Sequence, residues 1–348
     1  MKRDQDHCRG CLLGGAIGDA LGYRVEFMSY TQIQQKFGKG GIQDLVLSSS
    51  GKALISDDTQ MTLFTADGLL RAEMLWKEQG ISNLPSTIFY AYERWLVTQG
   101  YPWWENQEMT YDGWLFSVPE LHVRRSPGNA CIKSLSSRIQ GTIVNPINDS
   151  KGCGGVMRVA PIGLVCDTWN AFELGRDTAA LTHGHPSGYL SAGAMSFLIA
   201  LLMEGHNLEE AVEATLLKLS EFDRYQECWE KLKEAWDLSR QEIEPTLAIA
   251  KLGEGWVGEE ALAISVYCAL KYPYDFRKAV VTSVNHSGDS DSTGAITGNI
   301  LGAYLGISSI PEEWINGVEL SGLILQMADD LLTGYEDSDA WREKYPGS

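Results

Sequence analysis

Glycine recurs at every fourth position near both ends of the chain. The positions are Gly14, Gly18 and Gly22 in the first part, and Gly294, Gly298, Gly302 and Gly306 in the last. Residues four apart share one face of an α-helix, and a glycine inside a helix costs about 1 kcal/mol relative to alanine. Such stripes are unfavourable unless they let two backbones approach closely. We therefore expect the first and last core helices to pack together along them; the alternative is a set of unrelated, flexible glycines.

Apolar residues with helical spacing occupy much of the remaining sequence. They recur at intervals of three and four over residues 61–75, 88–97, 189–203, 211–219, 261–270 and 295–304. Gly, Pro, Asn and Ser separate these stretches, strand patterns are scarce, and no repeat or clear linker divides the chain. We expect an all-α fold, a single compact domain of orthogonally packed helices that covers residues 1–348. The polar stretch 223–244 is expected to be a solvated face or a connection.

The charge and the hydropathy of the chain limit its partners. It carries 46 acidic and 28 basic residues, a net charge of −18, whereas nucleic-acid binding depends on Lys and Arg that neutralise phosphates. The most apolar run, 192–203, falls well short of the roughly 20 apolar residues that a membrane span needs. We therefore expect no nucleic-acid partner and no membrane partner.

The seven cysteines are scattered, and an odd number of this kind is typical of reduced thiols in the cytosol. We therefore expect a cytoplasmic protein. Cys8 and Cys11 have the spacing of a zinc or redox pair, but a structural zinc site needs a second pair. We expect both to be buried in a helix.

Two short acidic clusters each precede an apolar helical stretch. One is Ser56-Asp57-Asp58, and the other is the segment 289–292, Asp-Ser-Asp-Ser. Capping of a helix explains one Ser or Asp at such a place but not two carboxylates. Four carboxylates at two positive helix ends would repel one another unless cations lay between them, and oxygen ligands favour Mg²⁺ or Mn²⁺. The two clusters together predict a divalent-metal site; capping or a solvated turn is the alternative.

A glycine-rich loop and two histidines lie between the acidic clusters. The loop, residues 151–158, has the sequence KGCGGVMR. Its N–H groups could form a concave nest for phosphate oxygens, although it lacks the end of a P-loop motif; a plain glycine-rich turn is the alternative. His183 and His185 are expected to shape or hydrogen-bond a ligand or to form a structural pair, and His286 could do either.

Five segments, in this order, resemble the ADP-ribosylglycohydrolase family, which includes the dinitrogenase-reductase-activating glycohydrolases. They are residues 10–27 (GCLLGGAIGDALGYRVEF), 56–70 (SDDTQMTLFTADGLL), 152–164 (GCGGVMRVAPIGL), 181–193 (LTHGHPSGYLSAG) and 285–302 (NHSGDSDSTGAITGNILG). Together they span nearly the whole chain. The resemblance implies an all-α fold with a binuclear metal cleft that holds two Mg²⁺ or Mn²⁺ ions.

The resemblance also assigns roles to individual residues. The positions that match the family's metal ligands are Ser56, Asp57, Asp58, Asp289, Asp291 and Ser292. Glu26 matches an acidic residue near the metals and the scissile bond, and we take Glu26, Asp58 and Asp291 as the catalytic candidates. The positions that match the diphosphate loop are Gly152, Cys153, Gly154, Gly155, Val156 and Met157, and His183 matches a ligand-contacting histidine.

Two features depart from the family pattern. Cys153 stands where the family often has Asn or Ser, so a polar contact to the ligand is weaker or missing. The insertion-like segment 124–129 leaves one further acidic position of some members without a clear counterpart, and Asp112 is a weak candidate for it.

The resemblance implies an activity: hydrolysis, at the ribose C1″, of the bond that joins ADP-ribose to a modified protein side chain, arginine first. The expected partners are ADP-ribose and ADP-ribosylated protein, and the expected state is a monomer. One alternative is an ADP-ribose-binding or interaction protein without catalysis. A second alternative is a binuclear phosphoesterase that acts on a nucleotide.

Overall fold

The computed structural model describes residues 2–104 and 110–347, and β-structure in these ranges is limited to the isolated bridges Ala53–Val318 and Gly152–Val257. The α-helices are α1 (Gln5–Gly22), α2 (Tyr30–Phe37), α3 (Asp57–Gln79), α4 (Leu84–Thr98), α5 (Asn129–Ser136), α6 (Ala160–Val165), α7 (Thr168–Ala180), α8 (Pro186–Glu204), α9 (Leu208–Leu219), α10 (Gln226–Ser239), α11 (Pro245–Leu252), α12 (Gly258–Lys271), α13 (Phe276–Val284), α14 (Ser290–Leu305), α15 (Glu312–Gly317), α16 (Ser321–Thr333) and α17 (Asp339–Lys344). Short 3₁₀ helices are η1 (Leu115–Ser117), η2 (Pro119–Leu121), η3 (Cys153–Gly155) and η4 (Ile307–Ser309).

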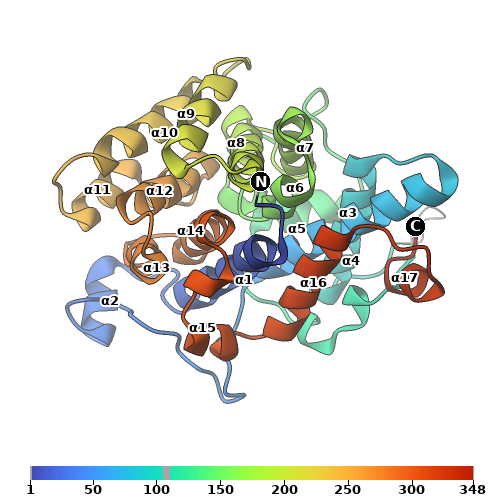
Figure 1. Cartoon of the computed structure of the whole chain (residues 1–348), viewed down its shortest axis with the longest axis horizontal. Helices are drawn as coiled ribbons and strands as arrows, with labels where there is room; N and C mark the ends of the chain where they lie inside the picture. The colour runs from blue at the N-terminus through green and yellow to red at the C-terminus, as the bar shows by residue number, and fades with distance from the viewer. Residues whose placement is uncertain (1, 105–109, 348) are drawn as a thin grey trace.

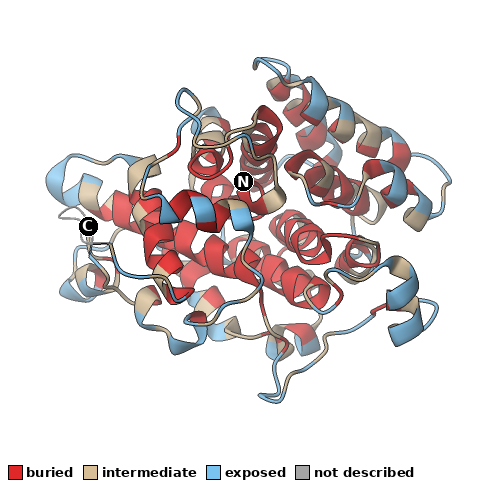
Figure 2. Cartoon of the chain, turned by 180° about the vertical axis from the view of Figure 1, so that it is seen from behind, coloured by how far each residue is buried: buried red, intermediate tan, exposed pale blue. Residues whose placement is uncertain are grey.

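The all-α prediction is confirmed, and the helices form a single domain around one large core. The six stretches with helical periodicity lie within α3, α4, α8, α9, α12 and α14. Figure 2 shows that burial is concentrated in the central helices, while the outer helices expose one side.

The glycine stripes pack against each other at the centre of the molecule. Helices α1 and α14 lie side by side and antiparallel (Figure 1), with Gly10 next to Gly302 and Gly14 next to Gly298. A Cβ added to Gly14 would lie 2.5 Å from the carbonyl oxygen of Gly298, closer than any real side chain packs. Only glycine therefore permits this approach, and the predicted pairing of the two chain ends is confirmed.

The apolar helix α8 is long and apolar enough, by composition alone, to cross a membrane. However, 89% of its apolar window is buried inside the fold. Its burial comes from neighbours on several sides, chiefly α7, α6, α9 and α12. A helix that is apolar all round is expected at the centre of a large core, and α8 has that position.

The stretch 223–244 is more than the solvated connection that its charge predicts. It contains α10, which packs against α12 and buries Cys228, Leu232, Ala235 and Leu238. These residues follow one another at intervals of four, three and three, which is the spacing of one helix face. The expectation is therefore wrong for the inner side of α10 and holds for its charged outer side.

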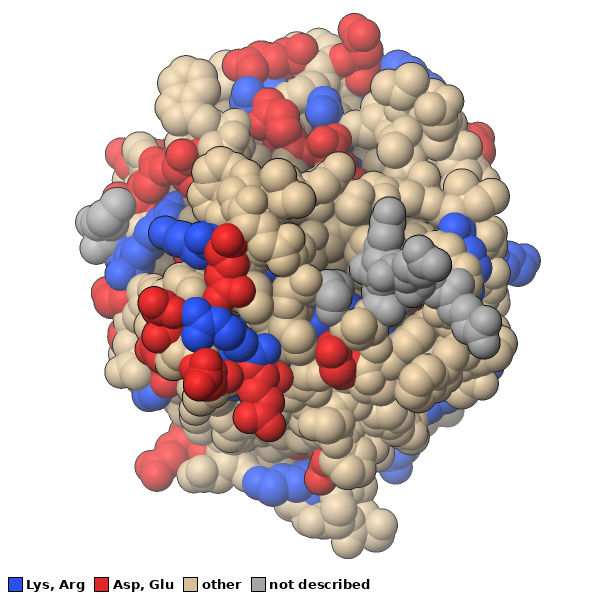
Figure 3. Space-filling model, turned by 90° about the vertical axis from the view of Figure 1, so that its right-hand side faces the viewer, with Lys and Arg blue, Asp and Glu red and all other residues tan. Residues whose placement is uncertain are grey.

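The face of the molecule in Figure 3 carries acidic and basic side chains close together on its left half. Ion pairs are frequent in the described part of the chain, and Arg342 of α17 pairs with Glu78 and with Asp339. Ion pairs of this exposed kind contribute little to stability.

Candidate active site

The first acidic cluster lies at the start of α3. Ser56 is the N-cap, and its hydroxyl accepts a hydrogen bond from the N–H of Asp58 at 3.2 Å. The carboxylate of Asp19, in α1, accepts hydrogen bonds from the N–H of Ser56 at 3.0 Å and from the N–H of Thr59 at 3.1 Å. The capping interpretation is thus correct for Ser56, whereas Asp57 and Asp58 line the cleft described below.

The second cluster lies at the start of α14. Asp289 is the N-cap and accepts a hydrogen bond from the N–H of Ser292 at 3.4 Å. The preceding residue, Gly288, has φ +123°, and a Cβ there would collide with Glu254. Its backbone conformation lets the N–H of Asp289 donate to the carbonyl of Glu254 at 2.8 Å. The glycine therefore sets the direction in which the chain enters α14.

Both clusters open onto one cleft of about 370 Å³. The predicted site residues that line it are Glu26, Asp57, Asp58, Gly152, Cys153, Gly154, Met157, His183, Asp289, Asp291 and Ser292. Three others, Ser56, Gly155 and Val156, are buried behind the wall. Residues more than 200 positions apart thus meet because α1 and α14 are paired.

The carboxylates of the cleft repel one another. Burial, followed by the charge of Asp291, raises the pKa of Asp57, Asp58 and Asp289 well above the ordinary value for an aspartate. Burial, and then repulsion by Asp291, raises the pKa of Glu26 to about 10. Without a counter-charge, this group of acids takes up protons to relieve the repulsion.

The residue types of the cleft fit a hard divalent cation. Glu26 Oε2 and Asp58 Oδ1 are buried oxygens without a hydrogen-bond partner in the described part of the chain, which is costly unless a cation or a proton satisfies them. Carboxylate and hydroxyl oxygens are the ligands that Mg²⁺ and Mn²⁺ prefer. Among residues 2–104 and 110–347, no group of three or more His, Cys, Asp or Glu side chains already has a geometry that could hold a metal ion. The binuclear centre therefore stays a prediction.

The glycine-rich loop forms one wall of the cleft. Several of its N–H groups already bind protein acceptors: Gly152 donates to Ser150 Oγ, Cys153 to the carbonyl of Trp256, and Met157 to the carbonyl of Cys153. The predicted phosphate-holding role therefore falls mainly on Gly154, which lines the cleft, and it stays a prediction.

Cys153, which stands where the family often has Asn or Ser, makes a hydrogen bond within the site. Its thiol donates a hydrogen bond to Asp289 Oδ2 at 2.6 Å. Burial, followed by the charge of Asp289, raises the pKa of the Cys153 thiol well above its ordinary value. Cys153 therefore remains a neutral thiol that orients Asp289.

His183 packs against the glycine loop. A Cβ on Gly154 would lie 3.1 Å from its ring, so glycine is what allows the ring to approach. Its Nδ1 lies 2.8 Å from Thr182 Oγ1, and Thr182 Oγ1 also accepts from the buried guanidinium of Arg158 at 2.7 Å. Burial, and then the charge of Arg158, lowers the pKa of His183 to about 3. His183 is thus a neutral imidazole held in a fixed orientation at the cleft.

The other two histidines are structural. The His185 side chain caps α8 by accepting from the N–H of Ser187 at 3.1 Å. The ring nitrogens of His286 lie 2.9 Å from the carbonyl of Ser287 and 2.9 Å from Thr293 Oγ1. Neither histidine lines the cleft, so the structural alternative is correct for both.

The insertion-like segment 124–129 closes the cleft beside α3. The N–H of Gly128 donates to Asp57 Oδ2 at 3.3 Å, and the carbonyl of Arg125 accepts from the N–H of Asp57 at 3.0 Å. Asp112 is elsewhere: it pairs with Arg71 at 3.2 Å and does not line the cleft. The structure therefore gives no support to Asp112 as a substrate-contacting acid.

Two residues of the site carry little signal in the sequence. Asp19 is a fully buried acid inside the glycine-striped helix, and a charge among apolar residues is the one sign that could have identified it. Trp256 stacks on Phe27 at the mouth of the cleft, with ring centroids 5.4 Å apart. Nothing in the local sequence predicts that contact, because the two rings are far apart along the chain.

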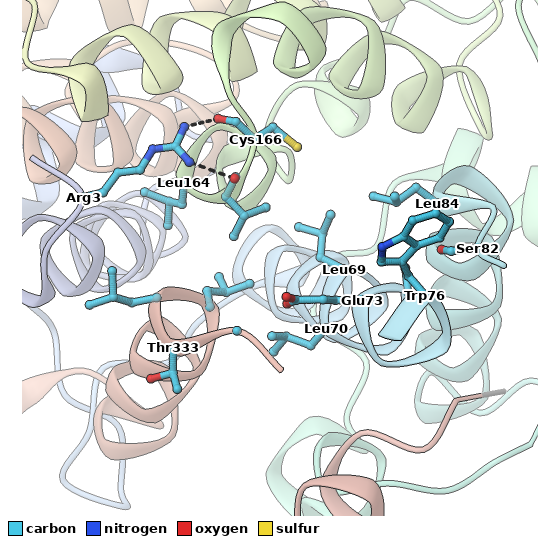
Figure 4. A pocket seen from close by; sticks show the side chains of 15 residues that line it. Arg3, Leu69, Leu70, Glu73, Trp76, Ser82, Leu84, Leu164, Cys166 and Thr333 are labelled. Carbon is cyan, nitrogen blue, oxygen red and sulfur yellow. Dashed lines mark hydrogen bonds between the residues drawn. The ribbon is translucent and has the colours of Figure 1, made fainter. Parts of the chain in front are cut away.

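A larger cavity, of about 680 Å³, lies away from these acids between α3, α6 and α16 (Figure 4). Six leucines contribute to its walls, and the guanidinium of Arg3 at its edge donates to the carbonyl of Val165 at 2.8 Å. Glu73 is the carboxylate that the figure shows inside it. The cavity lacks clustered acids, so we place the chemistry in the smaller cleft.

Comparison with known proteins identifies the family. The sequence profile described as ADP-ribosylglycohydrolase matches residues 1–340. The chain belongs to the ADP-ribosylglycohydrolase family. The prediction from the sequence motifs, including that of an ADP-ribosyl glycohydrolase as the class of enzyme, is confirmed at the level of the family.

Named relatives cover most of the chain. The bovine (Bos taurus) ADP-ribosylhydrolase ARH3 is 27% identical over 97% of this chain and 91% of its own length. The ADP-ribosyl-[dinitrogen reductase] glycohydrolase of Rhodospirillum rubrum is 23% identical over 90% and 91%. The ADP-ribosylarginine hydrolase Tri1 of Pseudomonas putida is 23% identical over 94% and 78%.

A solved structure with the same fold is titled an ADP-ribosylglycohydrolase-related protein complex. It superposes with a TM-score of 0.58 and 21% identity, and the match covers 99% of each chain. At this level of identity the likeness concerns the fold.

Proposed function

We propose that this protein is a divalent-metal-dependent hydrolase that removes ADP-ribose from a modified protein side chain, with mono-ADP-ribosylated arginine as its first substrate. The observation that carries the proposal is the meeting of two helix-start carboxylate clusters and Glu26 on one cleft. The similarity to relatives that include an ADP-ribosylarginine hydrolase supports the choice of substrate.

The ligands we propose for two Mg²⁺ or Mn²⁺ ions are Ser56, Asp57, Asp58, Asp289, Asp291 and Ser292. Small side-chain movements and water would complete the coordination. Divalent ions held there would supply Lewis-acid chemistry: they would help to hold the ribose hydroxyls and would lower the pKa of a nearby water. The ions would also remove the repulsion that raises the pKa values of these acids.

The residues of the chain supply the proton transfers. Cleavage at the ribose C1″ passes through an oxocarbenium-like state, as in other glycosides, and needs an acid for the leaving group and a base for water. Glu26 lines the cleft, and its Oε2 has no partner in the described residues. A protonated Glu26 can donate to the leaving atom, and its carboxylate can then accept a proton from water. Asp58 and Asp291, which also line the cleft, are the other candidates for the base.

The remaining walls hold the rest of the substrate. The N–H groups around Gly154 would bind the diphosphate, which needs such donors in a protein of net charge −18. Neutral His183, fixed by Thr182, would hydrogen-bond the ligand through Nε2. The monomeric state and the cytoplasmic location belong to the same proposal.

The test is to incubate the protein with mono-ADP-ribosylated arginine and serine substrates, with Mg²⁺, with Mn²⁺ and with a chelator. We expect free ADP-ribose from the arginine substrate, with release that stops in chelator. Binding of ADP-ribose without release would identify a non-catalytic binding protein, and release of phosphate would identify a phosphoesterase. Either of these results would overturn the proposal.

A further inference from the structure

A second groove adjoins the catalytic cleft on the other side of Glu26. It has a volume of about 420 Å³ and lies between the end of α1 and the irregular segment that follows α2. Glu26, Phe27 and Ser126 line both the groove and the cleft. The two spaces are therefore neighbours separated by one wall, and the proposed acid–base residue belongs to that wall.

The cleft and the groove lie where the two parts of an ADP-ribosylated protein would lie, the ADP-ribose and the polypeptide that carries it. In the proposed function, which this inference assumes, the cleft takes the ADP-ribose, because it contains the acids and the glycine loop. The leaving group must lie beside Glu26 to receive its proton. A polypeptide attached to that leaving group then has to continue past Glu26, and the adjoining groove offers the space.

The chemistry of the groove is unlike that of the cleft. Its lining includes two side chains that are large, apolar and unusually exposed, Phe27 at 68% and Leu47 at 54%. It also includes Arg24, which is exposed and makes no ion pair with a described residue. A free positive charge next to exposed apolar side chains, in a chain of net charge −18, favours a ligand that is partly apolar and carries a negative charge.

The backbone at the wall supports a functional role. Phe27 has φ 63° and Ser126 has φ 53°, a left-handed conformation that non-glycine residues rarely adopt. Strained residues of this kind cluster where a site holds a particular shape. Tyr23, directly after α1, also lines the groove, and its side chain is hydrogen-bonded to Ser126. This bond connects the end of α1 to the segment 124–129.

We propose that this groove binds the polypeptide that carries the ADP-ribose, as a short extended segment. An apolar side chain of the segment packs against Leu47 and Phe27, and an acidic side chain next to the modified residue pairs with Arg24. The groove thus selects the sequence around the modification, while the cleft selects the modification itself.

The experiment compares three substrates: free ADP-ribosyl-arginine, and two ADP-ribosylated arginine peptides that carry either Asp or Lys next to the modified residue. The variants are Arg24→Glu and Leu47→Asp. Their controls are Arg240→Glu, directly after α10, and Leu217→Asp on α9, which are exposed residues of the same types in other parts of the molecule. Steady-state kcat and KM are measured for every pair of enzyme and substrate.

We expect the wild type to have a lower KM for the Asp peptide than for the Lys peptide. Arg24→Glu should raise KM for the Asp peptide about tenfold, the effect of losing about 1.4 kcal/mol of binding, and should reverse the preference. Leu47→Asp should raise KM for both peptides. Hydrolysis of free ADP-ribosyl-arginine should stay within about twofold for both variants, because ground-state binding of the peptide part alone is lost.

Equal changes for the free compound and for the peptides would overturn the inference, since Arg24 would then act on the ADP-ribosyl part. Unchanged peptide kinetics, or the same change in the control variants, would overturn it as well. A wild type that hydrolyses none of the three substrates would instead refute the proposed function, so the two failures are distinguishable.

Discussion

At the scale of single residues, the acids of the cleft have different tasks. Asp19 accepts hydrogen bonds from the backbone at the start of α3, so its carboxylate holds the helix in place. Ser56 and Asp289 cap their helices. Asp57, Asp58 and Asp291 line the cleft beyond what capping requires. The capping and metal interpretations are therefore not exclusive, because one residue of each cluster caps while its neighbours face the cleft.

Asp289→Asn should separate two effects on stability: the repulsion between the buried acids and the stabilisation by bound Mg²⁺. The amide removes one buried negative charge, so the melting temperature in chelator should rise or stay unchanged. Saturating Mg²⁺ at about 100 times its Kd should stabilise the wild type by about 2.7 kcal/mol, and this gain should vanish in the variant. Thermal unfolding with and without Mg²⁺ measures both effects.

The control is Asp237→Asn, an exposed residue of α10, which should keep the full response to Mg²⁺. A normal Mg²⁺ response in Asp289→Asn would show that Asp289 is no ligand. If the protein were instead a non-catalytic binding protein, Asp289→Asn should leave its function unchanged.

Glu26→Gln tests the proton transfer. The substitution keeps the shape of the side chain but removes the acid, and positioned acid–base groups contribute about 100- to 10,000-fold to rate. We expect kcat to fall in that range while the Kd for ADP-ribose, measured by calorimetry, changes little. A fall of less than threefold would assign the proton transfer to another carboxylate, with Asp58 and Asp291 next in line.

At the scale of helices, the glycine stripes are the feature that the sequence predicts most directly. The spacing of four identifies a helix face, and the cost of so many glycines indicates a close partner. The structure adds the direction of packing, with Gly10 next to Gly302 and Gly22 next to Ser290. The second cluster is thereby carried to the end of α1 near Glu26. By contrast, the sequence pattern does not predict the apolar face of α10, because charged residues alternate with its apolar ones.

Gly14→Ala should destabilise the fold, because the new Cβ would lie 2.5 Å from a backbone oxygen of Gly298. Overpacking of a rigid contact costs about 1–3 kcal/mol, and we expect the upper end of that range in urea unfolding. Gly322→Ala in α16 is the control, since a Cβ there meets nothing within 4 Å. It should stabilise the protein by up to about 1 kcal/mol. Equal effects of the two changes would contradict the account of the stripe.

At the scale of the whole molecule, the stability of the protein is linked to protons and metal through the cleft. Burial raises the pKa of Asp19 to about 7, and burial with charge repulsion raises that of Glu26 to about 10. A carboxyl group whose pKa is higher in the folded state than in the unfolded state stabilises the fold when protonated. That stability is fully present below the unfolded pKa and is lost as the pH rises through the folded pKa.

The metal-free protein should therefore lose stability steadily between about pH 5 and pH 9, as these acids are forced to ionise in the fold. Mg²⁺ should offset the loss, so the difference in melting temperature between Mg²⁺ and chelator should grow with pH. Differential scanning fluorimetry across this range measures both curves. Parallel curves would show that the cation binds away from these acids.

The sequence by itself determined the helical class, the close pairing of the chain ends and the helix-start position of both acidic clusters, because periodicity, glycine cost and capping are local properties. Only the tertiary structure decided which residues reach the cleft. It left Ser56, Gly155 and Val156 behind the wall, placed His286 in a structural role, and brought Asp19, Gly128 and Trp256 to the site. The reason is that such contacts join segments far apart in the chain, and no local pattern records how distant helices pack.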